Sequence, residues 1–129
     1  MPLPNASFVI LFVSSPIESG AFYSRLLDLT PIEQSPTFVL FALPSGLMLG
    51  LWSKKTATPA VMAAGGGSEI CFSEDSAEKV QSIYDRWKQL DIPIAQKPTT
   101  MDGMSLTFVA VDPDGHRIRI LALEEVNHA

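Results

Sequence analysis

Cysteine and long apolar runs are scarce in this chain of 129 residues. The one cysteine, Cys71, has no second cysteine in the chain with which to form an internal disulfide. No charged-then-apolar leader opens the sequence, and no run is long and apolar enough to cross a membrane. These absences predict a protein without a membrane partner whose compartment is the cytoplasm.

Basic residues and phosphate-binding motifs are also lacking. The net charge is −5 with nine Lys and Arg residues, whereas nucleic-acid binding needs clustered cations that displace counterions. The adjacent pair Lys54-Lys55 is expected in a solvated loop. The glycine run 65–67 is not followed by the Lys-Ser/Thr of a phosphate loop, and no nucleophile elbow is present. We therefore expect no nucleic-acid partner.

The most informative segment is the turn Asp112–Gly115 between two strand-like runs. Pro113 fixes φ for an early turn position, and Gly115 accepts a positive φ. Residues 106–111 are rich in β-branched and aromatic side chains, and residues 118–122 are mostly apolar. The pattern predicts a β-hairpin. With two residues in its loop, Phe108 would lie opposite Arg119.

An internal repeat organises the chain. An offset of 61 positions aligns Tyr23 with Tyr84 and Arg25 with Arg86, and each half reads as strand, helix and further strands. Each half ends in a Pro-x-Gly turn, and the two turns lie 69 positions apart, so the second half has about eight extra residues. We expect these residues in the polar loop 97–103.

Two amphipathic helices support this plan. Apolar residues recur at three- and four-residue intervals over 76–90, with Ser76 as the predicted N-cap and Trp87 on the apolar stripe. A shorter helix is expected over 17–28 after Pro16. Between the halves, residues 53–67 are rich in Thr, Pro and Gly, which predicts a linker and leaves open a mobile flap over a site.

The hairpin string F-x-x-x-D-P-D-G-H and the pair Phe22-Tyr23 resemble the vicinal oxygen chelate superfamily. That superfamily contains glyoxalases, extradiol dioxygenases, fosfomycin-modifying enzymes and bleomycin-binding proteins. The resemblance implies an α+β fold in which two tandem βαβββ modules form a curved mixed sheet around a cleft. It predicts a single domain over 1–129, with module 1 at about 5–52, a linker at about 53–67 and module 2 at about 68–124.

The resemblance also places the metal ligands of the related enzymes on Phe8, Gly50, Glu69 and Arg119. Of these only Glu69 can coordinate a metal, whereas a catalytic zinc usually has three protein ligands. Arg119 stands where the enzymes usually have Glu and would set a positive charge against the ion. His116 and His128 are not expected to replace the missing metal ligands. By strand alternation His116 lies on the face opposite Arg119, and His128 is near the chain end. No metal or other cofactor is predicted.

A ligand-binding face follows from strand alternation. With two residues in the first hairpin loop as well, Phe41 lies opposite Met48 and Val39 opposite Gly50. Gly50 would leave open space beside Trp52 that suits a planar guest, although such an aromatic stripe can instead be core. The predicted ligand-binding residues are Trp52, Arg119, Phe108, Phe41, Met48, Phe8, Gly50 and Glu69.

Glu69 and Arg119 are expected to lie close together on neighbouring strands. They would form an internal salt bridge, or Arg119 would offer its guanidinium to a ligand with Phe108 beside it. Cys71 falls inside an apolar strand and is expected to be a buried, inert thiol.

Our leading hypothesis is a metal-independent small-molecule binding protein. It would sequester a planar aromatic compound such as an antibiotic, as bleomycin- and phenazine-resistance proteins do, and would form a homodimer like such relatives. One alternative is a glyoxalase-like lyase or another enzyme of the superfamily, using Glu69 as general base with or without a divalent metal. A third is a structural or regulatory module with a filled cleft.

Overall fold

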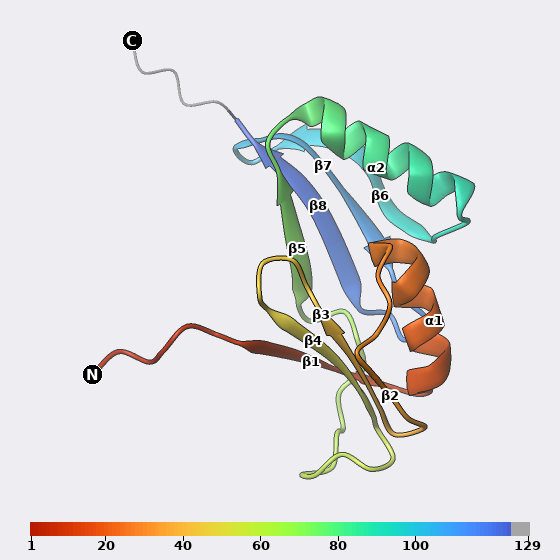
Figure 1. The fold of residues 1–129 in the computed structure, drawn as a ribbon. Coiled ribbons are helices and arrows are strands. Elements are labelled where there is room, and N and C mark those ends of the chain that lie inside the picture. The colour runs from red at the N-terminus through yellow and green to blue at the C-terminus, as the bar shows by residue number, and fades with distance from the viewer. Residues whose placement is uncertain (125–129) are drawn as a thin grey trace. The chain divides into compact units, whose positions relative to one another are not determined.

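The computed structural model describes residues 1–124 (Figure 1). The chain forms two compact units, and the boundary between them lies between Ala63 and Ala64. The first unit contains β1 (Phe8–Val13), α1 (Pro16–Leu27), β2 (Glu33–Gln34), β3 (Phe38–Ala42) and β4 (Met48–Ser53). The second contains β5 (Glu69–Glu74), α2 (Ala77–Gln89), β6 (Ile94–Met101), β7 (Met104–Val111) and β8 (Arg117–Leu123). The predicted α+β class and the βαβββ order of each half are confirmed.

Each unit has one four-stranded mixed sheet with the same topology. The strand order is β1-β4-β3-β2 in the first unit and β5-β8-β7-β6 in the second. The first strand of each unit pairs in parallel with the last, and the remaining pairs are antiparallel. Residues 1–124 thus form two four-stranded sheets, one in each unit, in which β1 and β5 are edge strands.

The two helices begin and end close to their predicted boundaries. The hydroxyl of Ser15 accepts a hydrogen bond from the Glu18 amide at 3.3 Å, and Pro16 occupies the first turn of α1. Ser76 caps α2 in the same way, accepting from the Lys79 amide at 3.3 Å. No helix within residues 1–124 is long and apolar enough to span a membrane.

The β3–β4 loop and the β7–β8 loop each contain three residues instead of the two expected. In the second hairpin the Asp112 amide donates to the His116 carbonyl at 2.9 Å, so Pro113, Asp114 and Gly115 form the loop. Gly115 has φ of 87° and the corresponding Gly46 has φ of 95°, the left-handed conformation that three-residue hairpins require. The additional residue shifts the register of both hairpins by one position.

This register shift moves Phe41 and Phe108 to the opposite sheet face from the one predicted. Phe41 pairs with Leu49, and Phe108 pairs with Ile120 instead of Arg119. Phe108 is fully buried beneath α2, with ring centroids 5.3 Å from Tyr84 and 5.4 Å from Trp87. A one-residue slip reverses the direction of every side chain in a strand, so both phenylalanines belong to the core.

The two segments expected to be loops, residues 53–67 and 97–103, have different structures. The extra residues of the second half extend β6 through the predicted polar loop, and that strand turns into β7 at Asp102 and Gly103. Residues 54–68 contain no helix or strand. Gly65 nevertheless packs closely on the β7–β8 hairpin, because a Cβ there would lie 2.6 Å from the Asp114 carbonyl oxygen.

Candidate functional site

An apolar surface covers the face of the first sheet that points away from α1. We call it the aromatic face. Strand partners in β1 and β4 share a side of the sheet, and β3 contributes Phe38, which is paired with Trp52. The aromatic face consists of Phe8, Ile10, Phe12, Phe38, Met48 and Trp52.

The rings of the aromatic face are partly accessible to solvent. Phe12 and Trp52 lie with centroids 5.8 Å apart at an interplanar angle of 34°. Phe8 is 54% exposed, and Phe12, Met48 and Trp52 are half-buried. Large apolar groups that remain accessible on one face are the usual lining of a small-molecule site, and tryptophan presents the largest flat surface among them.

Gly50 does not leave the open space expected beside Trp52. A Cβ at Gly50 would lie 2.7 Å from Cδ1 of Ile10 and 2.9 Å from Cζ of Phe38, so these side chains already fill the position. The absence of a side chain at Gly50 lets two neighbouring strands bring apolar groups together over it. The glycine therefore contributes to a continuous surface and not to a hole.

Four of the predicted ligand-binding residues lie together on this sheet side: Phe8, Met48, Gly50 and Trp52. Phe41 is not among them, because it lies in the core under α1. Sequence reasoning missed Ile10, Phe12 and Phe38. The signal for the first two was present, since they follow Phe8 at intervals of two along an extended strand.

A charged cluster occupies the second sheet, on the side away from α2. We call Glu69, Arg117 and Arg119 the arginine–glutamate cluster. Arg119 donates from Nε to Glu69 Oε1 at 2.7 Å and from Nη2 to Glu69 Oε2 at 3.1 Å, a bidentate pair. Arg117 also pairs with Glu69 Oε2 through its Nη2. One carboxylate is thus shared by two guanidinium groups.

Arg119 also donates hydrogen bonds to two neutral side chains. Its Nη1 donates to Gln96 Oε1 at 3.1 Å and to Thr107 Oγ1 at 3.0 Å, and its side chain is only 13% exposed. Of the two roles considered for Arg119, the structure shows the internal salt bridge. Arg117, which the sequence reasoning missed, shares this side of β8 because it precedes Arg119 by two residues.

The arginines make Glu69 a weak base. The hydrogen bond from Arg119, together with the positive charges of Arg119 and Arg117, holds the Glu69 pKa below its ordinary value of 4.5 even though partial burial opposes this shift. Both carboxylate oxygens are engaged by guanidinium groups. This arrangement is unfavourable for a general base, which needs an accessible oxygen and a pKa nearer the working pH.

The residues at the four expected metal positions do not fit a divalent ion. Phe8 and Gly50 offer no ligand atom, Arg119 is a cation, and Glu69 is committed to two arginines. Within residues 1–124 no group of three or more His, Cys, Asp and Glu side chains is placed to hold a metal. His128 lies outside the described residues.

Cys71 differs from its predicted burial. It pairs with Arg119 across the β5–β8 ladder and is exposed, since the alternation of β5 turns it to the side that carries the arginine–glutamate cluster. Partial desolvation and the nearby Glu69 carboxylate raise the thiol pKa above its ordinary value of 9.0. A thiol that stays protonated at neutral pH is a poor nucleophile.

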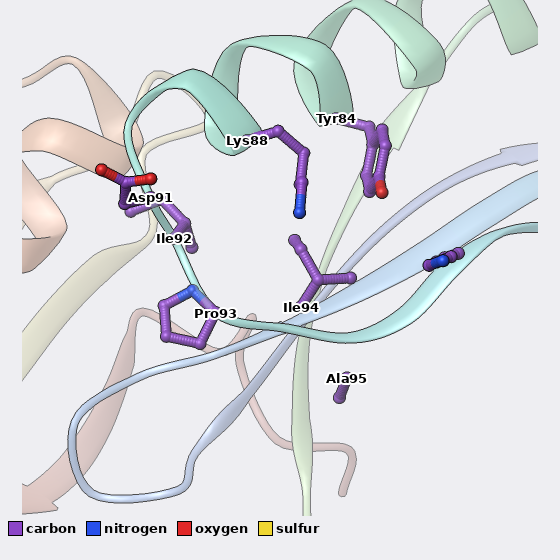
Figure 2. Close-up of a pocket in the computed structure, with 8 residues that line it drawn as sticks. Tyr84, Lys88, Asp91, Ile92, Pro93, Ile94 and Ala95 are labelled. Carbon is purple, nitrogen blue, oxygen red and sulfur yellow. The ribbon is translucent and has the colours of Figure 1, made fainter.

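The second unit also has a surface hollow of about 390 Å³, between the end of α2 and the start of β6 (Figure 2). Figure 2 shows Tyr84 and Lys88 descending from α2 towards Ile94, while Asp91 points away from them. None of the predicted ligand-binding residues lines this hollow. It is therefore distinct from the arginine–glutamate cluster of the same unit.

Comparison with known proteins places the fold in a family. The model of the Glyoxalase/Bleomycin resistance protein/Dioxygenase superfamily matches residues 6–120. The phenazine antibiotic resistance protein EhpR of Enterobacter agglomerans is 27% identical over 126 residues, covering 95% of each chain.

Solved structures agree with this family. A protein of Agrobacterium tumefaciens, solved by NMR in solution, is 38% identical with a TM-score of 0.82, covering 95% of this chain and all of its own. A glyoxalase/bleomycin resistance protein/dioxygenase from Nocardioides is 21% identical with a TM-score of 0.85, covering 98% of this chain and 88% of its own. Because the family model matches residues 6–120, the chain belongs to the glyoxalase/bleomycin resistance protein/dioxygenase superfamily.

Proposed function

We propose that this protein binds a planar aromatic small molecule on the aromatic face without the help of a metal ion. The observation that carries the proposal is the accessible pair of Phe12 and Trp52, set among further apolar side chains on one side of a rigid sheet. Flat aromatic guests stack on such rings in offset or tilted arrangements. Shape and stacking are sufficient for sequestration, which needs no catalytic group.

The relative from Enterobacter agglomerans suggests the class of guest. That protein is described as a phenazine antibiotic resistance protein, and phenazines are flat three-ring compounds of the kind the aromatic face suits. We infer a resistance role in which the bound compound is withheld from its target. In the cytoplasm, the compartment we predict, this protein would meet a compound that has already entered the cell.

Catalysis through Glu69 is the less favoured function. An enzyme of the glyoxalase type would need Glu69 to accept a proton, but two arginines occupy its oxygens and lower its pKa. A role as metal ligand would require those ion pairs to break. Neither role is supported by an accessible oxygen in the cluster.

Isothermal titration calorimetry with phenazine-1-carboxylate in the presence of EDTA tests the proposal. We expect saturable binding to the wild type that Trp52→Ala weakens by roughly tenfold or more, since stacking on one aromatic side chain is worth about 1–3 kcal/mol. Trp52→Phe, which keeps a ring, should retain most of the affinity. If EDTA abolishes binding or Trp52→Ala leaves it unchanged, the proposal is wrong.

We also propose that the protein is a homodimer. Phe8 exposes an apolar ring on β1, and β1 and β5 are edge strands in their sheets. Accessible apolar groups and unpaired strand edges favour association with a second copy. Sedimentation equilibrium should give about twice the monomer mass, whereas a monomer at micromolar concentration would contradict this.

A further inference from the structure

We propose that Arg117 binds the carboxylate of a small organic acid on the exposed side of the second sheet. The inference goes beyond the proposed function and does not rest on it. It assigns the anion-binding role to a residue other than Arg119, whose guanidinium already donates four hydrogen bonds.

The charge balance of the arginine–glutamate cluster favours an anion. Two guanidinium groups share one carboxylate, so the cluster carries a net positive charge in a chain whose net charge is −5. The next residues of β5 on the same side, Cys71 and Ser73, are uncharged and exposed. The positive charge is therefore presented on an otherwise neutral surface.

The two arginines have different commitments. Every nitrogen of the Arg119 guanidinium donates to Glu69, Gln96 or Thr107, and the side chain is largely buried. Arg119 thus acts as a positioning residue that holds Glu69 in place.

Arg117 is the arginine with donors to spare. It meets Glu69 through Nη2 alone, and its side chain is 41% exposed. Its Nε is buried and has no hydrogen-bond partner within residues 1–124, so a ligand would reach this guanidinium through its Nη groups. A guanidinium has five N–H groups arranged in a fork, and a carboxylate is the group that satisfies two of them at once.

Glu69 sets how strongly an acid would bind. The Glu69 carboxylate compensates part of the positive charge of Arg117, so an incoming carboxylate competes with Glu69 for the same guanidinium. Removing that competition with Glu69→Gln should raise the affinity for a carboxylate several-fold. An unchanged or weaker affinity would contradict this account of the cluster.

A matched pair of ligands tests the assignment by calorimetry. Benzoate and the neutral benzamide differ in charge but hardly in shape. We expect the wild type to prefer the carboxylate by about tenfold, in line with a charged hydrogen bond. Arg117→Gln should remove this preference. Arg86→Gln, which makes the same exchange at an exposed position on α2, should keep it.

Cys71 provides a second readout that does not depend on phenazine binding. It is the one cysteine of the chain and lies beside the cluster, so its reaction with the neutral reagent 4,4′-dithiodipyridine reports on occupancy there. Benzoate should slow the reaction in the wild type but not in Arg117→Gln, and benzamide should slow it in neither.

The outcomes separate the two proposals. No slowing by benzoate, or equal slowing in Arg117→Gln, overturns the assignment to Arg117. A carboxylate preference that survives Arg117→Gln does the same. If benzoate protects Cys71 through Arg117 but phenazine-1-carboxylate does not bind to the aromatic face, the anion site stands and the proposed phenazine-type ligand is wrong.

Discussion

At the scale of single residues, the ion pairs of Glu69 replace the metal ligation that relatives would place there. The carboxylate accepts from Arg119 at two atoms and also pairs with Arg117, within one sheet. Hydrogen bonds to charged groups are among the stronger ones in proteins, and two arginines without Glu69 would repel each other. Glu69 is therefore expected to stabilise the second unit.

Stability should depend on pH through this residue. Because the folded-state pKa of Glu69 lies below 4.5, its contribution is fully present above that value and is lost as the pH falls through the folded pKa. We expect Glu69→Gln to lower the free energy of unfolding by roughly 1–3 kcal/mol at pH 7. Urea denaturation at several pH values should show this difference shrinking below about pH 4.5. A difference that grows in acid would contradict the ion-pair account.

Gly65 offers a second test at this scale. A Cβ at this position would lie 2.6 Å from the Asp114 carbonyl oxygen and 2.8 Å from the His116 amide nitrogen, both backbone atoms. Gly65→Ala should therefore destabilise the protein by about 1–3 kcal/mol. Gly67→Ala is the matched control, because nothing lies within 4 Å of its Cβ position, and its free energy of unfolding should stay within about 0.5 kcal/mol. Equal melting temperatures for the two variants would show that the segment does not pack on the hairpin.

At the scale of elements, the hairpin loops decide which residues share the aromatic face. Gly46 and Gly115 each occupy the left-handed third position of a three-residue loop. The one-residue difference in loop length sends Phe41 and Phe108 into the core and leaves Phe38 on the aromatic face.

Phenylalanine truncation tests this register directly. Phe108→Ala removes a fully buried ring from between Tyr84 and Trp87 and should cost about 3–5 kcal/mol of stability. Phe8→Ala removes a ring that is 54% exposed and should cost less than about 1 kcal/mol. The register with two-residue loops would place both rings on the ligand-binding face. Comparable costs in chemical denaturation would therefore favour that register.

The sequence was sufficient to predict the elements but not the contacts between them. The helix at residues 77–89 follows from apolar periodicity and the cap Ser76, and the helix at residues 16–27 was predicted after Pro16; these are local signals. The Pro-x-Gly turns were found, but a Gly after Pro-Ser or Pro-Asp is compatible with loops of two or three residues. Side-chain direction depends on that choice, so only Phe8, Met48, Gly50 and Trp52 of the predicted residues share one side of the first sheet.

Charges and cavities were harder to predict for a related reason. Strand alternation puts Arg117 beside Arg119, yet only the structure shows that every guanidinium nitrogen of Arg119 donates a hydrogen bond while Nε of Arg117 has no partner within residues 1–124. Likewise Gly50 suggested open space, because the sequence cannot show that Ile10 and Phe38 reach over it. The exposure of Cys71 depends on the side to which β5 turns it.

At the scale of the whole molecule, the two units repeat one architecture but present different chemistry. The first has an apolar, aromatic sheet face, and the second has a polar one built around Glu69 and two arginines. Residues 1–124 bring together no group of three or more His, Cys, Asp and Glu side chains placed to hold a metal, while the rings of the aromatic face are partly accessible. This combination is why we favour binding over catalysis.

The most direct test of this account is a ¹⁵N-resolved NMR titration with phenazine-1-carboxylate in the presence of EDTA. The chain has two tryptophans, so its two indole N–H signals can be followed separately. Trp52 lies on the aromatic face, whereas Trp87 is 4% exposed and packs on Phe108. We predict that the Trp52 signal shifts to saturation while the Trp87 signal stays in place. A Trp52 signal that does not move at millimolar ligand would contradict the proposal that this protein binds planar aromatic compounds on that face.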